Sequence, residues 1–128
     1  MPTSVLVLDP EPVFQTSVAR KLRLHGMLVL TRPGFDGLAS LLESFSIDAL
    51  IIDTALLRDG LEPLRWITES CPDAAIVLTA APEDSTLVRL ARELGIDGCL
   101  TKPIHPDALL RAIETRVAGR GARQGRPA

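Results

Sequence analysis

Short, unbroken runs of apolar residues recur along the chain, each bounded by polar or turn residues. The first four runs do not alternate apolar with polar positions, and such continuous runs are typical of strands that are buried on both faces. Strands buried on both faces occur in parallel sheets that are covered by helices. The runs span residues 5–8, 27–30, 49–52, 75–78 and 98–100.

The segments between these runs carry the 3.6-residue repeat of amphipathic helices. The repeat is clearest at Leu87, Leu90, Ala91 and Leu94. A strand followed by a helix, five times over, predicts an α/β fold with a five-stranded, doubly wound parallel sheet and helices on both of its faces. In such open sheets, sites form beyond the carboxyl ends of the strands, where the strand order reverses.

The last ten residues, 119–128, differ from the rest of the chain. They show no periodicity, contain no large apolar residue and include three arginines. We therefore predict a folded domain over residues 1–118 and a flexible Gly/Arg/Pro tail or linker over residues 119–128.

Composition excludes several classes of function. A net charge of −2 and an aromatic content of 3% disfavour direct binding of nucleic acid, which needs cationic rows and stacking surfaces. Two cysteines are too few for a disulfide framework. No apolar run approaches the ~18 residues of a membrane span, so we expect no membrane insertion and a cytoplasmic location.

Polar residues stand where four of the predicted strands end: Asp9, Asp53, Thr79 and Lys102. A single residue of this kind is more often a turn or capping residue than a reactive one. Four of them at strand ends favour a shared site. Two carboxylates can bind a hard divalent cation, or one can act as a nucleophile, while lysine and threonine contact phosphoryl oxygens. The pattern predicts phosphoryl transfer to a carboxylate.

Four segments, with residues 5–9, 48–53, 76–80 and 95–104, resemble the first, third, fourth and fifth strands of bacterial response-regulator receiver domains, which are CheY-like, flavodoxin-like domains. The resemblance covers roughly residues 4–118. It implies the strand order 2-1-3-4-5 and a role in two-component or phosphorelay signal transduction.

The resemblance assigns roles by position. Asp53 would accept a phosphoryl group from a histidine kinase or phosphotransfer protein. Lys102 would pair with that group, and Thr79 would move toward it on activation. Pro103 would follow a cis peptide bond.

The resemblance also implies a Mg²⁺ site, from which this sequence departs. Asp9, Asp53 and the backbone carbonyl of Ala55 would be ligands, but Pro10 stands where the family has a second acid. Glu11 could replace the missing ligand or could complement the dipole at the start of a helix. We favour the second interpretation, because two prolines stiffen its backbone, and we expect weak Mg²⁺ binding.

A second departure is Cys99, where the family has a switch aromatic. The sequence therefore keeps open an alternative function, in which a phosphorylation-independent pseudo-receiver binds a protein partner or forms a homodimer. Its surface would comprise the fourth helix, the fifth strand and the fifth helix. The exposed charges expected to set its specificity are Arg89, Arg92, Glu93, Arg111 and Glu114.

The resemblance implies a signalling domain rather than a dedicated enzyme, although the pocket would catalyse its own phosphorylation and dephosphorylation. Aspartyl-phosphate hydrolases place a second aspartate two residues after the nucleophile. The corresponding residue here is Ala55, which disfavours a hydrolase.

Overall fold

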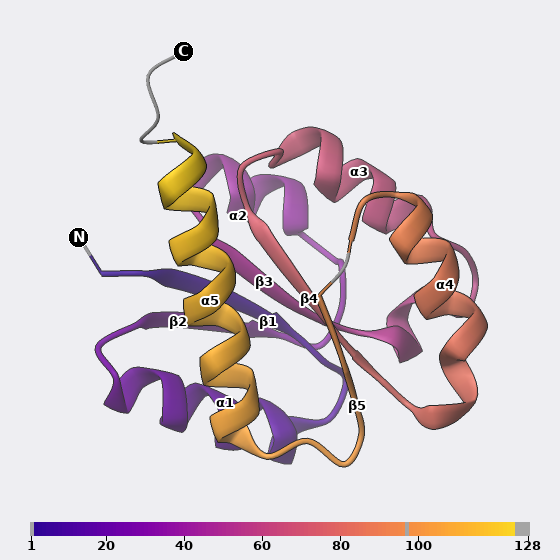
Figure 1. Ribbon diagram of the computed structural model, residues 1–128, viewed down its shortest axis with the longest axis horizontal. Coiled ribbons are helices and arrows are strands. Elements are labelled where there is room, and N and C mark those ends of the chain that lie inside the picture. Colours follow the sequence, from indigo (N-terminus) through magenta and orange to yellow (C-terminus); the bar gives the residue numbers. More distant parts are fainter. Residues whose placement is uncertain (1, 97, 125–128) are drawn as a thin grey trace.

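The computed structural model describes residues 2–96 and 98–124, which form five strands and five α-helices (Figure 1). Strand and helix alternate along the chain, with short 3₁₀ helices after the third and fourth strands. The strands are β1 (Ser4–Leu8), β2 (Leu28–Arg32), β3 (Ala49–Asp53), β4 (Ala75–Ala80) and β5 (Gly98–Thr101). The helices are α1 (Pro12–Leu24), α2 (Leu38–Ser44), η1 (Thr54–Leu57), α3 (Glu62–Ser70), η2 (Pro82–Asp84), α4 (Ser85–Glu93) and α5 (Pro106–Gln124).

All strand pairs are parallel, and the strand order is β2-β1-β3-β4-β5. Both features confirm the predicted doubly wound sheet. The order reverses between β1 and β3, so the residues that follow these two strands lie side by side at one edge of the sheet. In the pairing of β3 with β4, Asp53 stands opposite Thr79.

The two faces of the sheet bury different residues of the same strands. In β1, Val5 and Val7 pack on the face covered by α1 and α5, whereas Leu6 and Leu8 pack on the face covered by α2, α3 and α4. The strands β3 and β4 divide their side chains in the same way. Each strand must therefore be apolar at every position, which explains the unbroken runs in the sequence.

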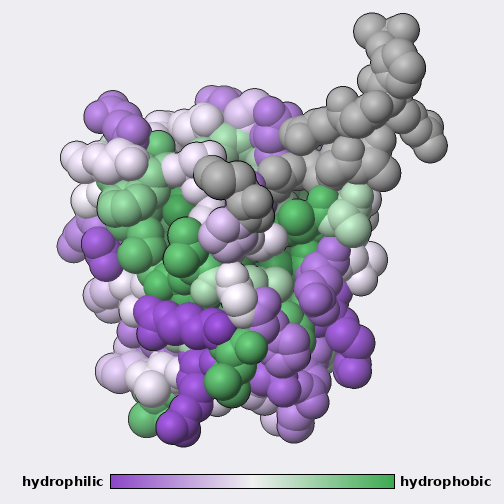
Figure 2. All heavy atoms as spheres, turned by 90° about the vertical axis from the view of Figure 1, so that its left-hand side faces the viewer, coloured by the Kyte–Doolittle hydropathy of each residue, from purple (hydrophilic) through white to green (hydrophobic). Residues whose placement is uncertain are grey.

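The strand β2 departs from the predicted burial on both faces. Its first residue, Leu28, is 60% exposed, although Val29 is buried. The reason is that β2 is an edge strand, which pairs with β1 alone. The side of the molecule on which β1 and β2 begin shows hydrophobic surface between hydrophilic groups (Figure 2).

Helix ends follow the local signals of the sequence. Gly26 and Gly95, after α1 and α4, have φ angles of 80° and 92°, a conformation that favours glycine. At the start of α5, the Nδ1 atom of His105 accepts a hydrogen bond of 3.1 Å from the backbone N–H of Asp107. Lys21 and Asp107 form an ion pair of 2.5 Å that joins α1 to α5.

The helix α5 extends to Gln124, into the segment 119–128 for which the sequence predicts a tail. Residues 125–128 lie outside the described residues. Within the part of the chain that the structure describes, none of the helices combines the length and apolar character needed to span a membrane.

Candidate functional site

Asp53 ends β3 and is only 3% exposed. Its carboxylate has two partners from different loops. The backbone N–H of Ala55 donates a hydrogen bond of 2.7 Å to Oδ1, and the ammonium group of Lys102 pairs with Oδ2. The first contact arises because η1 begins directly after Asp53, which acts as its N-cap. Asp53 is therefore a buried anion held by one amide and one cation.

Asp9 follows β1 and is 1% exposed. Its Oδ1 accepts a hydrogen bond of 2.8 Å from the backbone N–H of Glu11, while its buried Oδ2 has no hydrogen-bond partner among the described residues. Burial raises the pKa of Asp9 to about 6. The Glu11 hydrogen bond opposes this rise, the neighbouring Asp53 adds to it, and the charge of Lys102 lowers it again.

Lys102 follows β5, and the peptide bond between Lys102 and Pro103 is cis, as the resemblance implies. Its ammonium group lies 5.6 Å from the centre of the Phe14 ring, within range of a cation–π interaction. Burial would lower the pKa of Lys102, but its hydrogen bond to Asp53 and the nearby acids raise it overall. The lysine therefore stays charged beside Asp53.

Thr79 lies on β4 beside Asp53 and is fully buried. Its hydroxyl group has no hydrogen-bond partner among the described residues. A buried hydroxyl without a partner is costly, so this group is available to a ligand that reaches the pocket. The structure thus brings four side chains together at the carboxyl ends of the strands, those of Thr79, Asp9, Asp53 and Lys102.

A divalent cation fits this pocket in part. Asp9 and Asp53 supply two adjacent buried carboxylates, and the orphaned Oδ2 of Asp9 is the oxygen donor that a hard cation prefers. Pro10 and Glu11 are exposed, and Glu11 contacts Asp9 through its backbone N–H. Among the described residues, no group of three or more His, Cys, Asp or Glu side chains could hold a metal. Two carboxylates and backbone oxygens are thus the available donors.

One set of contacts beside the pocket was not predicted from the sequence. The hydroxyl group of Thr54 donates a buried hydrogen bond of 2.8 Å to Oδ2 of Asp84, and Arg58 donates a second of 3.1 Å to the same oxygen. The Arg58 guanidinium and the Thr54 hydroxyl hold the pKa of Asp84 below its ordinary value. Thr54 directly follows Asp53, so these contacts join the loop after β3 to the loop after β4.

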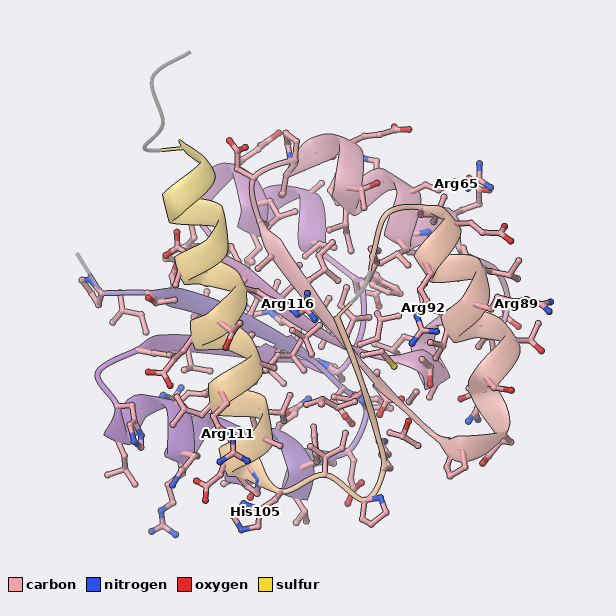
Figure 3. The ribbon with its side chains drawn as sticks, in the orientation of Figure 1. Arg65, Arg89, Arg92, His105, Arg111 and Arg116 are labelled. Carbon is pink, nitrogen blue, oxygen red and sulfur yellow. The ribbon has the colours of Figure 1, made fainter. Side chains whose placement is uncertain are left out.

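The face formed by α4, β5 and α5 carries exposed arginines (Figure 3). Arg89 extends outward from α4, whereas Arg92 lies on the side of α4 toward β5. Arg111 projects from α5. Cys99 on β5 is half-buried, and burial raises the pKa of its thiol. These residues form the surface that the alternative function requires.

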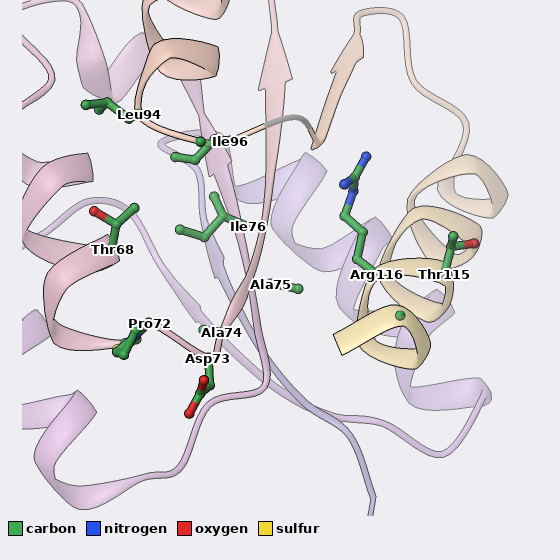
Figure 4. A pocket seen from close by; sticks show the side chains of 13 residues that line it. Thr68, Pro72, Asp73, Ala74, Ala75, Ile76, Leu94, Ile96, Thr115 and Arg116 are labelled. Carbon is green, nitrogen blue, oxygen red and sulfur yellow. The ribbon is translucent and has the colours of Figure 1, made fainter. Parts of the chain in front are cut away.

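A cavity of about 680 Å³ lies at the opposite end of the sheet, where β4 begins (Figure 4). Ala75, Ile76, Ile96 and Arg116 are among its lining residues. Ligands of doubly wound sheets bind beyond the carboxyl ends of the strands, where Asp53 lies. We therefore place the candidate site at Asp53 and not in this cavity.

The chain is thus a doubly wound α/β domain in which a buried aspartate stands at the end of each of two adjacent central strands and a lysine pairs with one of them. Residues 5–114 match the family model of the response regulator receiver domain. The chain belongs to this family. Its members are signalling domains of two-component systems, which interact with histidine kinases or phosphotransfer proteins, generally bind Mg²⁺ at the acidic pocket, and in some cases dimerise.

Curated relatives include the response regulator MprA of Mycobacterium sp. (strain KMS), 33% identical over 124 residues, covering 92% of this chain and 53% of the relative. The transcriptional regulatory protein DegU of Brevibacillus brevis is 24% identical over 118 residues, covering 90% of this chain and 50% of the relative. The chain thus spans about half the length of these relatives.

Solved structures agree on the fold. A response regulator receiver domain protein from Clostridium thermocellum superposes with a TM-score of 0.83 at 27% identity, covering 94% of this chain and 98% of that chain. The beryllofluoride-activated receiver domain dimer of NtrC4 superposes with a TM-score of 0.80 at 19% identity, covering 91% of this chain and 98% of that chain, a likeness of fold alone.

Proposed function

We propose that this domain accepts a phosphoryl group on Asp53 from a phosphohistidine of a histidine kinase or phosphotransfer protein. The observation that carries the proposal is the pairing of a buried Asp53 carboxylate with Lys102 at the point where the strand order reverses. A carboxylate in this position is held by fixed groups at the carboxyl ends of the strands, where ligands of doubly wound sheets bind.

In the proposed reaction, a carboxylate oxygen of Asp53 forms a bond to phosphorus while the bond from phosphorus to the imidazole nitrogen breaks. The imidazole leaves and takes up a proton. Lys102 neutralises charge on the transferred group, and the unpartnered hydroxyl of Thr79 donates a hydrogen bond to one of its oxygens. Catalysis is mainly positioning and electrostatics, so the pocket supports its own phosphorylation without being a dedicated enzyme.

Asp9, Asp53 and the backbone carbonyl of Ala55 are the residues that would hold Mg²⁺. Bound there, the ion would supply positive charge to the phosphoryl oxygens and relieve the repulsion between the two buried carboxylates. Because Pro10 supplies no side-chain ligand, we expect binding to be weak.

Intact-mass measurement after treatment with acetyl phosphate or phosphoramidate tests the proposal, with Mg²⁺ in excess. We expect one added phosphoryl group in the wild type and none in Asp53→Asn. The matched control is Asp36→Asn, which removes an exposed acid and should be modified like the wild type. Modification that survives Asp53→Asn would place the acceptor elsewhere, and no modification with any donor would contradict the proposal.

Cys99 favours a second candidate function, a pseudo-receiver that binds a protein partner or a second copy through the α4–β5–α5 face. A half-buried thiol lacks the ring whose two orientations make the family's surface bistable. A ligand shifts a conformational equilibrium only by its differential affinity for two states.

An amide-shift map with and without beryllofluoride tests this second function, once binding has been verified separately. If Cys99 leaves the face static, large shifts will be confined to the loops around Asp53 and Thr79. Comparable shifts throughout α4 and β5 would show that another residue replaces the aromatic switch, and would contradict the expectation.

A further inference from the structure

Asp84 occupies a position where an aspartate side chain usually caps the helix that follows it. It is the N-cap of α4, and an N-cap carboxylate ordinarily accepts hydrogen bonds from the free backbone N–H groups of the first turn. Here the side chain makes no such capping bond. Its Oδ2 accepts instead from Thr54 and Arg58, in the loop after β3. The start of α4 is therefore bonded to the loop that carries Asp53.

The helix α4 has few other attachments. Ala91 is its only described residue that is buried, and Leu90 is 37% exposed. Helices anchored by so little apolar contact open locally at low free energy, unless polar contacts hold them. Because Asp84 is buried to 8% exposure and its bond to Thr54 is buried as well, that bond is screened little by water.

We propose that Asp84 is a positioning residue, which together with Thr54 and Arg58 forms a latch that ties the start of α4 to the acceptor loop. Its role in signalling rests on the proposed function: the latch keeps the arginine-bearing face of α4 in one position while the state of Asp53 changes. The latch thus supplies a physical reason for a static face that is independent of Cys99.

The two contacts differ in strength. Thr54 directly follows Asp53 and is fully buried, so loss of its hydroxyl leaves the Asp84 carboxylate poorly solvated. The Arg58 side chain is 53% exposed, and exposed ion pairs contribute little. We therefore expect Thr54 to carry most of the coupling and Arg58 to carry a smaller share.

Amide hydrogen exchange on the full chain tests the latch without any phosphoryl donor. Thr54→Val preserves the β-branched shape of the side chain but removes its hydroxyl group. The exchange rate of the amides in residues 82–93 should then rise by about fivefold or more, because one hydrogen bond contributes a factor of this size. Thr54→Ser restores the hydroxyl and should restore slow exchange. Arg58→Gln should give a smaller rise, and Arg65→Gln, an exposed arginine paired at 3.9 Å with Glu62, should give none.

The rise in the amide exchange rate must be confined to α4 and the loop before it. Two results would overturn the proposal. One is an unchanged exchange rate in this region of Thr54→Val. The other is a uniform rise in exchange that includes α5 and that also occurs in Thr54→Ser. A denaturation midpoint for each variant separates local opening from loss of the fold. Failure of Asp53 to accept a phosphoryl group would contradict the proposed function but would not alter the exchange rates by which the latch is judged.

Discussion

Replacement of Asp9 by asparagine should stabilise the folded domain at neutral pH when Mg²⁺ is absent. The pKa of Asp9 is about 6 in the folded chain, against 3.8 for an ordinary aspartate, because burial and Asp53 disfavour the charged form. At about 1.4 kcal/mol per pKa unit, this difference costs the folded state at most about 3 kcal/mol. Asparagine keeps the oxygen that accepts from the Glu11 N–H, so Asp9→Asn removes the charge and leaves that hydrogen bond in place.

The sign of the pH dependence follows from the raised pKa. Well below pH 3.8 the carboxyl is protonated in both folded and unfolded chains, so it has no effect on stability. Between about pH 4 and pH 6 the unfolded chain loses its proton first, and the wild type loses stability that Asp9→Asn retains. Above about pH 6 the difference in the free energy of unfolding between the wild type and Asp9→Asn stays constant.

Urea denaturation in the presence of EDTA, at pH values from 4 to 8, measures this difference. Asp9→Asn should exceed the wild type by about 1–3 kcal/mol at pH 7.5 and by little at pH 4. Asp36→Asn, which removes an exposed acid, serves as the control and should follow the wild type. A variant that is no more stable than wild type at pH 7.5, or a difference independent of pH, would show that Asp9 carries no such penalty. Added Mg²⁺ should stabilise the wild type more than Asp9→Asn.

Two further predictions concern other parts of the chain. Pro10→Asp should tighten Mg²⁺ binding about tenfold, or ~1.4 kcal/mol, because it adds a carboxylate ligand; equal affinities by calorimetry would contradict this. Gly98→Ala should destabilise the fold by about 1–3 kcal/mol in urea. Its Cβ would lie 2.6 Å from the backbone oxygen of Ile76, which cannot move aside cheaply, and an unchanged midpoint would show that β5 shifts instead.

The strand positions could be predicted because burial on both faces leaves a direct mark on the sequence. Val5 and Leu6 point to opposite faces and are both fully buried, so β1 reads as an unbroken apolar run. The exposure of Leu28 could not be predicted in the same way. An edge strand lacks a neighbouring strand on one side. Which strand stands at the edge is set by the topology of the whole sheet and not by the residues of that strand.

The residues of the site were predictable because each stands at or directly beside the end of a strand, but their hydrogen-bond partners were not. The parallel sheet alone placed Asp53 and Lys102 at the same end of the sheet, and the resemblance implied that Lys102 pairs with the phosphoryl group on Asp53. The Thr54–Asp84 bond joins residues 30 positions apart, and an aspartate before a helix predicts an N-cap rather than a contact with another loop. The one available signal was a hydroxyl-bearing residue directly after the proposed phosphoacceptor.

The unequal helices on the two faces have a consequence for motion. The face with α1 and α5 is covered by helices of 13 and 19 residues, whereas α2, α3 and α4 have 7, 9 and 9. Short helices with little buried surface fray and shift more readily than long ones. Asp9 and Lys102 lead into the long-helix layer, and Asp53 and Thr79 lead into the short-helix layer. The pocket therefore lies where residues that lead into both helix layers meet, so movement of the shorter helices α3 and α4 would reach Asp53 and Thr79 before Asp9 and Lys102.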